Sequence, residues 1–423
     1  MNLDNLDMKK SIALINDGQT EKGIEQLKKV AEIADHETKY QIAEVYYQLG
    51  LVNLAKEIIE ELIIFYPEES ELATFMAELL IDLDEEDEAI EILLEIKESD
   101  PVFLQAQLLL ADLYQLQGLD EVAEQKLLNA ENIVPSEPIV LFGLAEFYLS
   151  RGDYLKSIPY YKQVLPFQEE LEGTNIGLRL AEAFSGSGAF EEAITYYEGG
   201  IKNSATIDEH FGYGYTALQL SMFKVAIKQF EEVIDMDESY SSLYPYLAEA
   251  YEAEGQIHEA VQIIKKGLEI DEYNEALYVQ GARVSLNNRD IESAEKYLRN
   301  VLAMNTANLE AASILGNLLK KESRWDELEE LMVYLKSHGE DDPQFEWFLA
   351  TAKRETAEDN ESLKLYEQVS ITLSHDSDFM EEYGIALLED GYREKAKQIL
   401  TNAYQLDVTK SHLQEILFDL EDQ

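Results

Sequence analysis

The segment LYPYLAEAYEAEGQIHEAVQIIKKGLEIDEYN (243–274) decides the fold of this 423-residue chain. Its small residues Ala248 and Ala260 are twelve positions apart, Gly255 lies between them, and Ile264 follows one helical turn after Ala260. A small residue on each of two helices permits close helix–helix approach, and a glycine can adopt the positive φ that ends a helix. A large residue one turn further along the same face fills the space beside the small one. The segment therefore predicts two helices joined by a tight turn.

This pattern recurs along the chain with a period of 34 residues, apart from one spacing of 36 and one of 33. In successive units the small position of the second helix holds Ala55, Ala89, Ala123, Ser157, Ala193, Ala226, Ala260, Ala294 and Ala396, with weaker matches at Leu328 and Ser362. The small position of the first helix holds Ala43, Ala77, Ala111, Ala145, Ala181, Gly214, Ala248, Ala282, Gly316, Ala350 and Gly384. The turn glycines are Gly50, Gly118, Gly152, Gly188, Gly255 and Gly391. About twelve such units in register predict a repeat architecture, in which each unit contacts only its neighbours.

These positions resemble the tetratricopeptide repeat (TPR), both in 243–274 and in LFGLAEFYLSRGDYLKSIPYYKQVL (141–165). The resemblance extends from about residue 4 to 409. It implies an all-α fold, a right-handed superhelical solenoid of about twelve TPR helix–turn–helix repeats, with ligands bound along the concave face that the first helices form. The chain also resembles the YpiA-type TPR proteins of Bacillus relatives.

Departures from the pattern divide the chain into four predicted parts. Residues 1–35 form a degenerate first repeat with Gly23 in the small position, 36–173 form units 2–5, and 174–409 form units 6–12. Residues 410–423 form a C-terminal capping helix, because one of its faces is apolar and the other polar. The apolar face carries Leu413, Ile416, Leu417 and Leu420.

Unit 5 and the segment after it depart most from the repeat. Pro159 lies inside the predicted second helix, the linker PFQEELEGTN (166–175) is two residues longer than usual, and eight of the 21 glycines fall between Gly173 and Gly214. Proline and glycine kink or interrupt helices. The sequence predicts either a hinge or a static kink at residues 160–214 and does not decide between them.

Composition excludes several classes of function. The chain carries 86 acidic and 33 basic residues, a net charge of −53, which repels nucleic acid and anionic lipid and favours basic proteins or peptides. General surface solvation is the alternative explanation of this acidity. The chain has no cysteine, hence no disulfide or thiolate metal site. A secretory signal and an apolar run long enough to insert into a membrane are both missing, which predicts a cytoplasmic protein.

Motifs for catalysis are also lacking. The six histidines are dispersed, and DEEDE (84–88) lacks the alternating ligands and central glycine of a calcium loop. No phosphate-binding loop or nucleophile elbow is present. We therefore expect no enzyme activity, no metal and no cofactor.

Helical geometry predicts which side chains of the first helices face a ligand. The residue after the first small position is turned about 100° away from the packing face, and we expect it to be exposed. This slot holds Glu44, Glu78, Asp112, Glu146, Glu182, Tyr215, Glu249 and Arg283 among others, and the slot four residues earlier holds Tyr40, Phe142, Phe211 and Trp347. An acidic stripe beside an apolar stripe is suited to a basic or amphipathic segment of a partner protein. Chance acidity and repeat duplication are the alternative explanation.

Basic residues occupy corresponding positions in units 9–11. Arg283, Lys320, Lys321 and Arg354 could hold a carboxylate of a ligand. Intramolecular pairing with nearby Glu322 or Glu355 is the favoured alternative. The sequence thus predicts a non-enzymatic scaffold or adaptor that binds a protein or peptide. A homo-oligomer, as a self-assembling structural solenoid, or an assembly factor for a larger complex is the alternative.

Overall fold

The computed structural model describes residues 3–171, 173–201, 205–356 and 359–421. The chain divides into two compact units, residues 1–204 and 205–423. The first unit contains α1 (Leu3–Asn16), α2 (Thr20–Ile33), α3 (His36–Gln48), α4 (Val52–Phe65), α5 (Ser70–Asp82), α6 (Glu86–Leu94), α7 (Phe103–Leu116), α8 (Asp120–Ile133), α9 (Pro138–Ser150), α10 (Tyr154–Val164), β1 (Glu170–Leu171), β2 (Thr174–Asn175), α11 (Ile176–Gly186) and α12 (Phe190–Gly200).

The second unit contains only helices within its described residues. These are α13 (Ile207–Gln219), α14 (Phe223–Met236), a 3₁₀ helix (Ser241–Leu243), α15 (Tyr244–Ala253), α16 (Ile257–Ile270), α17 (Glu275–Asn287), α18 (Ile291–Met304), α19 (Leu309–Lys321), α20 (Trp325–Ser337), α21 (Pro343–Glu355), α22 (Asp359–Val369), α23 (Ser377–Glu389), α24 (Arg393–Leu406) and α25 (Ser411–Glu421).

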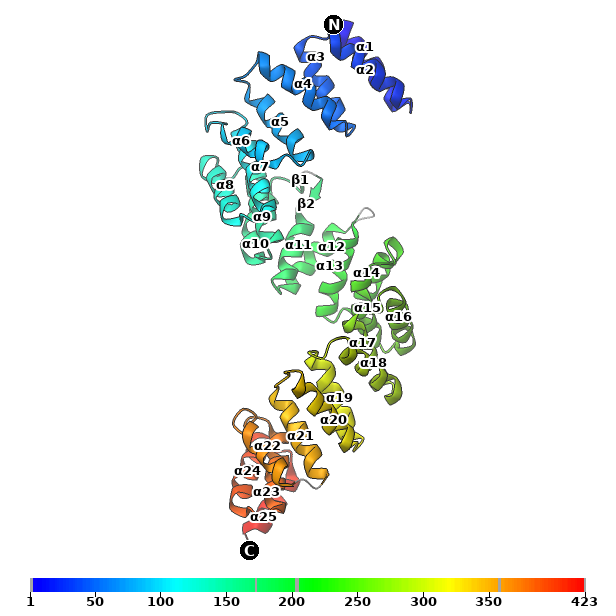
Figure 1. Cartoon of the computed structure of the whole chain (residues 1–423), viewed down its shortest axis with the longest axis vertical. Coiled ribbons are helices and arrows are strands. Elements are labelled where there is room, and N and C mark those ends of the chain that lie inside the picture. The colour runs from blue at the N-terminus through cyan, green and yellow to red at the C-terminus, as the bar shows by residue number, and fades with distance from the viewer. Residues whose placement is uncertain (1–2, 172, 202–204, 357–358, 422–423) are drawn as a thin grey trace. The chain divides into compact units, whose positions relative to one another are not determined.

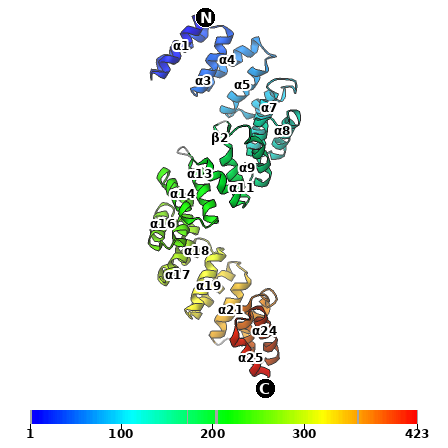
Figure 2. The same ribbon diagram turned by 180° about the vertical axis from the view of Figure 1, so that it is seen from behind.

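Each odd-numbered helix from α1 to α23 packs against the even-numbered helix that follows it, and each pair packs on the next within its unit (Figure 1). The view from behind shows the same succession of helix pairs (Figure 2). Twelve helix pairs are present in the described residues, and α25 follows the last of them. The predicted all-α repeat architecture is confirmed.

The small positions lie where the helices of a pair meet. All the alanines there are at most 1% exposed. A Cβ atom added to Gly214 would lie 2.7 Å from the Phe230 ring, and one added to Gly384 would lie 2.5 Å from Leu400. In unit 11 the hydroxyl of Ser362 donates a 2.7 Å hydrogen bond to the Ala350 carbonyl, which links the two small positions of that pair directly. Close packing therefore favours small side chains at these sites, although unit 10 buries Leu328 at one of them.

The turn inside each pair has a left-handed residue at a fixed place. All six predicted turn glycines have positive φ, from 71° to 83°. The next residue returns its N–H to the first helix, as in the 2.8 Å bond from Gln256 N to the Tyr251 carbonyl. This bond is the one that satisfies a helix end in a Schellman motif.

Four units place a residue other than glycine at this left-handed position. They are Asp84, Ser221, Arg289 and Ser323, with φ of 55° to 61°. A side chain at such a φ crowds the following carbonyl. These four units have no glycine at the turn. The surrounding repeat therefore holds the turn residue at a positive φ that its own side chain disfavours.

Replacing Ser221 or Ser323 by glycine should therefore stabilise the second unit. We expect a gain of about 0.5–1 kcal/mol each, the relief of left-handed crowding less the added entropy of an unfolded glycine. Gly255→Ala should cost about 1 kcal/mol for the same reason. Chemical denaturation followed by circular dichroism measures these changes. Gln262→Gly, in the exposed middle of α16, is the control and should destabilise; a loss of stability in Ser221→Gly and Ser323→Gly would contradict the strain argument.

The linker 166–175 folds into a short antiparallel ribbon that the sequence did not predict. Leu171 pairs with Thr174, and Gly173 has φ of 79°. Asn175 then caps α11, because its side chain accepts a 3.0 Å hydrogen bond from Leu178 N. Pro159 lies inside α10, the second helix of its pair, as predicted. Whether 160–214 acts as a hinge or a kink stays a prediction.

The end of the chain is capped as predicted. Leu413 is fully buried, and Ile416, Leu417 and Leu420 pack against the core of the second unit. Lys410 and His412 each lie 2.6 Å from a carboxylate oxygen of Glu381 on α23. Among the described residues, none of the helices is both long and apolar enough to cross a lipid bilayer.

Candidate functional site

The first helices α3, α5 and α7 enclose a hollow of about 330 Å³, which we call the N-terminal hollow. It brings together three of the residues predicted from the sequence, Tyr40, Glu44 and Glu78. Its complete lining is Tyr40, Glu44, Tyr47, Gln48, Glu71, Thr74, Phe75, Glu78, Val102 and Gln105. The lining thus contains three carboxylates and neither lysine nor arginine.

Aromatic rings form one wall of the N-terminal hollow. The ring centroids of Tyr40 and Tyr47 lie 5.7 and 5.6 Å from that of Phe75, both edge-on. Phe75 is buried, and its packing holds the two tyrosines in place. Burial raises the pKa of Tyr40, and the charges of Glu44, Glu71 and Glu78 raise it further. The phenol therefore stays neutral in a negative local potential.

The carboxylates of the N-terminal hollow have few counter-charges. Glu44 and Glu71 are exposed, whereas Glu78 is half-buried and accepts a 2.7 Å hydrogen bond from the Gln105 amide. Burial raises the pKa of Glu78 above its ordinary value. Lys39, on the same helix as Glu44, pairs instead with Glu61 at 2.6 Å. Carboxylates beside aromatic rings can hold an ammonium or guanidinium group.

Farther along, the predicted acidic stripe does not stay uniformly exposed. Asp112 and Glu182 are exposed, but Glu146 is half-buried. Glu146 accepts a 2.6 Å hydrogen bond from the buried Tyr161 hydroxyl and lies 3.3 Å from Arg179, which also pairs with Glu182 at 2.9 Å. Burial raises the pKa of Glu146 despite these contacts. The expectation that every residue of this slot is exposed is wrong at Glu78, Glu146 and Tyr215, which are half-buried against neighbouring side chains.

The apolar slot also divides into packed and accessible residues. Phe142 and Trp347 are buried, with ring centroids 6.4 Å from Tyr161 and 5.7 Å from Phe379 respectively. Their rings therefore pack inside the protein, whereas the prediction placed them on an open surface.

Two other predicted aromatic residues belong to a ring cluster in the second unit. Phe211 is half-buried and lies 5.8 Å from Phe230 and 5.4 Å from Tyr240. Tyr215 lies 5.4 Å from Tyr246, edge-on. This cluster joins α13 to α14 and α15, which indicates a packing role for much of its ring surface.

A second hollow on first helices, of about 420 Å³, lies between α15 and α17 and includes the predicted Glu249 and Arg283. Arg283 forms an ion pair with Glu310 of the next helix pair. Glu252 accepts a 2.7 Å hydrogen bond from Gln280 and another from Asn287. Burial raises the pKa of Glu249. Internal partners thus occupy most polar groups here.

Lys320 and Arg354 are paired within the protein, as the favoured alternative expected, but with different partners, whereas the pairing of Lys321 stays a prediction. Lys320 pairs with Glu382 and Arg354 with Glu389, both on α23, in place of the predicted Glu322 and Glu355. Glu382 also accepts hydrogen bonds from Trp347 Nε1 at 2.8 Å and from the Thr351 hydroxyl at 3.0 Å. The sequence analysis did not predict a role for Glu382. The only sequence feature that marks this residue is its position two residues before Gly384 on a first helix.

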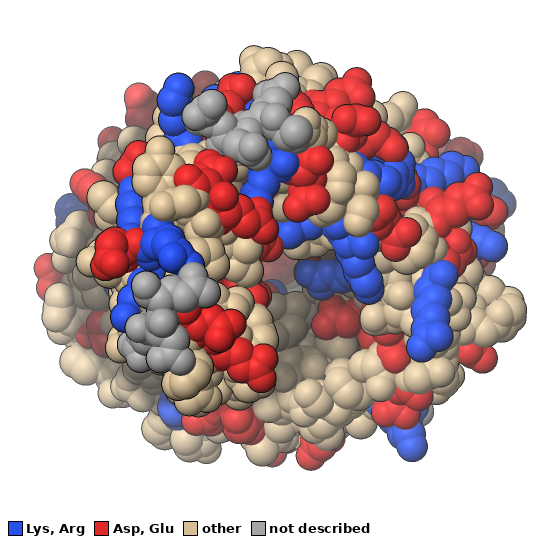
Figure 3. Space-filling view, turned by 90° about the horizontal axis from the view of Figure 1, so that it is seen from below, with Lys and Arg blue, Asp and Glu red and all other residues tan. Residues whose placement is uncertain are grey.

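Figure 3 shows the same mixture of charges in space-filling form. Acidic and basic side chains lie next to one another over much of the visible face of the molecule. The N-terminal hollow differs from this mixture, since its lining carries acidic charge alone.

Repeated pairs of antiparallel helices, with small residues where they meet, define a TPR protein, and a TPR family model matches residues 247–274. The presence of TPR repeats indicates a scaffold for protein–protein interaction. Models for YpiA-like tetratricopeptide repeats match residues 115–168 and, for the C-terminal repeats, 343–407. The TPR repeat-containing protein YpiA of Bacillus subtilis (strain 168) is 39% identical over 416 residues, which cover 98% of each chain. The chain belongs to the YpiA-like family of TPR proteins.

Another family model, the ARM repeat of tetratricopeptide repeat protein 21, matches residues 5–123. Solved structures resemble the chain at low identity. Cut9 with Hcn1, an APC/C hetero-tetramer, is 12% identical, covers 99% of this chain and 96% of that one, and has a TM-score of 0.43. MamA from Desulfovibrio magneticus RS-1 is 16% identical over 40% of this chain and 96% of that one, with a TM-score of 0.37. YrrB, described as a TPR protein with an unusual peptide-binding site, is 14% identical over 44% and 95%, with a TM-score of 0.37.

Proposed function

We propose that this protein is a non-enzymatic adaptor that binds a basic or amphipathic segment of a partner protein through the N-terminal hollow. The observation that carries the proposal is the lining of that hollow, three carboxylates and three aromatic rings without a basic residue. A lysine or arginine of the partner would supply the missing counter-charge.

The aliphatic stem of such a side chain would pack against Tyr40 and Tyr47, while its charged end would reach Glu44 and Glu71. Cations are attracted both to ring faces and to carboxylates, and a half-buried site strengthens both interactions. Apolar residues of the same segment would contact the exposed parts of the rings. The net charge of −53 would speed the encounter with a basic partner.

Changing Glu44, Glu71 and Glu78 together to glutamine should weaken binding of basic peptides at least tenfold, because an exposed or half-buried charged contact contributes about 0.5–1 kcal/mol or more. The probe is a fluorescent peptide enriched on the full chain from a random display library, with affinity measured by anisotropy. The dependence of affinity on salt should also become shallower, since fewer ion pairs form.

Glu57→Gln, Glu60→Gln and Glu91→Gln together are the matched control. All three are exposed on second helices of the same repeats, so they remove the same charge from outside the hollow. Equal loss of affinity in the two triple variants would reduce the effect to net charge and contradict a site in the hollow. Enriched peptides without an excess of lysine and arginine would contradict it too.

A further inference from the structure

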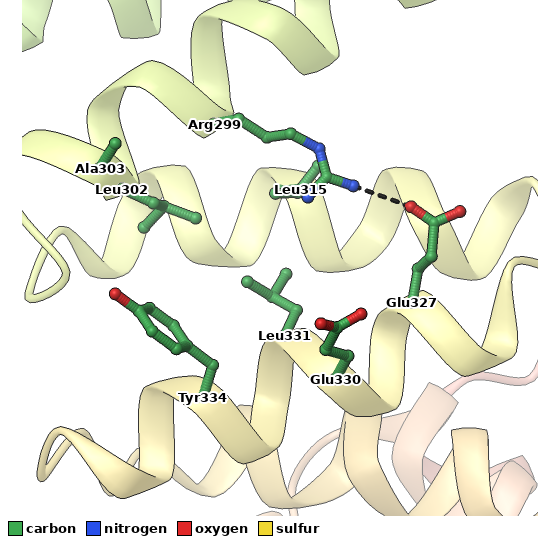
Figure 4. Close-up of a pocket in the computed structure, with 8 residues that line it drawn as sticks. All are labelled: Arg299, Leu302, Ala303, Leu315, Glu327, Glu330, Leu331 and Tyr334. Carbon is green, nitrogen blue, oxygen red and sulfur yellow. Dashed lines mark hydrogen bonds and ion pairs between the residues drawn. The ribbon is translucent and has the colours of Figure 1, made fainter.

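A third hollow lies in the second unit, between the second helices α18 and α20 and over Leu315 of α19 (Figure 4). It is separate from the first-helix hollows described above. We call it the second-helix hollow. Its volume is about 330 Å³. Its lining is Arg299, Leu302, Ala303, Leu315, Glu327, Glu330, Leu331 and Tyr334. Leu302 and Leu315 are buried and form an apolar floor, whereas Tyr334 is 45% exposed.

Leu331, in the lining of the hollow, has counterparts of different size in the other units. Leu331 lies three residues after the small position of its helix, and units 5, 6 and 9 hold a tyrosine there, Tyr160, Tyr196 and Tyr297. Each of those rings packs on an aromatic ring of the first helix, with centroids 5.8, 5.8 and 5.9 Å apart. Unit 10 has the shorter leucine at this place. Isoleucine or leucine also stands at this place in units 2, 3, 8, 11 and 12, as Ile58, Ile92, Ile263, Leu365 and Ile399, so the aromatic ring is a feature of three units and not of the repeat.

The rim of the second-helix hollow carries ion pairs and one additional negative charge. Arg299 lies 2.7 Å from Glu295 and 2.9 Å from Glu327, and Arg324 lies 2.6 Å from each of these carboxylates. Hydrogen bonds from Arg324 hold the pKa values of Glu295 and Glu327 below their ordinary range. The charges of these two arginines and two glutamates cancel, so the exposed Glu330 gives the rim a net negative charge.

We propose that the second-helix hollow binds an aromatic side chain of a partner protein, next to a lysine or arginine in that partner. The ring lies on the floor of Leu302 and Leu315 and against the Tyr334 ring. The neighbouring cation meets Glu330. An aromatic anchor in an apolar pocket with a charged rim is a common arrangement of a binding hot spot.

Charge argues against the most exposed aromatic residues of a second copy as the occupant. Exposed aromatic residues in the described part of the chain include Phe65, Phe167, Tyr273 and Phe418. Each is followed within four residues by at least one acidic residue, and none of the four has a lysine or arginine within four residues of it. An acidic rim would repel such segments. Tyr392 differs, since it is 56% exposed and is followed by Arg393 and Lys395, so a second copy is the alternative that the test must separate.

Saturation-transfer NMR on the full chain tests the proposal with tryptamine, which combines an aromatic ring with an ammonium group. We expect tryptamine to bind and indole-3-acetate, which has the same ring with a carboxylate, to bind at least tenfold more weakly. Leu331→Tyr should abolish tryptamine binding, because a larger side chain at a residue that lines the hollow takes up its volume. The measurement is repeated in the chain with Glu44, Glu71 and Glu78 changed to glutamine, so that the N-terminal hollow does not contribute.

Ile263→Tyr is the matched control, since Ile263 has the same place on α16. It should leave tryptamine binding unchanged. Leu331→Tyr should keep the helicity and denaturation midpoint of the unchanged chain, which separates filling from misfolding. Tryptamine binding that survives in folded Leu331→Tyr would overturn the proposal, and so would equal binding of indole-3-acetate. A concentration-dependent dimer that Leu331→Tyr removes would identify a second copy as the occupant and would overturn it as well.

Discussion

Replacing Phe230 by alanine should lower the free energy of unfolding of the second unit by about 3–5 kcal/mol. Phe230 is fully buried on α14, one turn after Ala226. Its ring fills the space that Gly214 leaves on α13, and its centroid lies 5.8 Å from Phe211 and 6.4 Å from Tyr246 on α15. Truncation would open a cavity where three helices meet, so two neighbouring repeats would lose contacts at once.

Chemical denaturation measures this change, and amide hydrogen exchange locates it. Protection should fall first in α13–α15, because repeat proteins are stabilised mainly by neighbouring repeats. Phe167→Ala is the control, since that side chain is 68% exposed and its loss should cost less than about 0.5 kcal/mol. A Phe230→Ala variant no less stable than the control would contradict the packing described for the small positions.

Glu382→Ala should have the next largest effect, a loss of about 2–3 kcal/mol. The carboxylate accepts from Trp347, Thr351 and Lys320, so its removal leaves Trp347 and Lys320 without this acceptor in a mostly buried place, whereas the Thr351 hydroxyl can still donate to the Trp347 carbonyl. Partial exposure of Lys320 and Glu382 keeps the expected loss below that of a fully buried pair. The emission of Trp347 should change together with the stability, because its indole N–H loses its partner.

Glu382→Gln separates the hydrogen bonds from the charge. The amide oxygen can still accept from Trp347, so this variant should lose less stability than Glu382→Ala. Glu394→Ala removes an exposed carboxylate from α24 and should change stability by less than about 0.5 kcal/mol. Equal stability of Glu382→Ala and Glu394→Ala would show that the contacts at Glu382 contribute little.

The helix pairs could be predicted because their determinants lie close together in the sequence. Ala248, Gly255 and Ala260 specify two helices and a turn within thirteen residues, and the same spacing repeats down the chain. The short ribbon at 170–175 was missed because two paired residues on each side leave no detectable alternation of polar and apolar residues. The left-handed conformation of Ser221 and Ser323 was missed because serine does not favour it by itself.

The candidate site was predicted only in part. Three residues of the inward slots, Tyr40, Glu44 and Glu78, line one hollow, since helical geometry places them on one side of neighbouring first helices. Trp347 has an equivalent slot but is buried, because α23 covers it with Phe379. The second-helix hollow was not predicted, since an unfilled volume depends on the size of side chains from three helices.

The sequence by itself determined the repeat, its period, the capping helix and the acidic character, because small residues, turns and net charge act over one helix pair or over the whole composition. Only the tertiary structure decided which charges stay without a partner. Glu146 meets Arg179 and Lys320 meets Glu382 across successive or alternate repeats, 33 and 62 residues apart, whereas the lining of the N-terminal hollow includes no basic residue. Ion pairing and burial depend on distances between side chains of different repeats, and packing alone sets those distances.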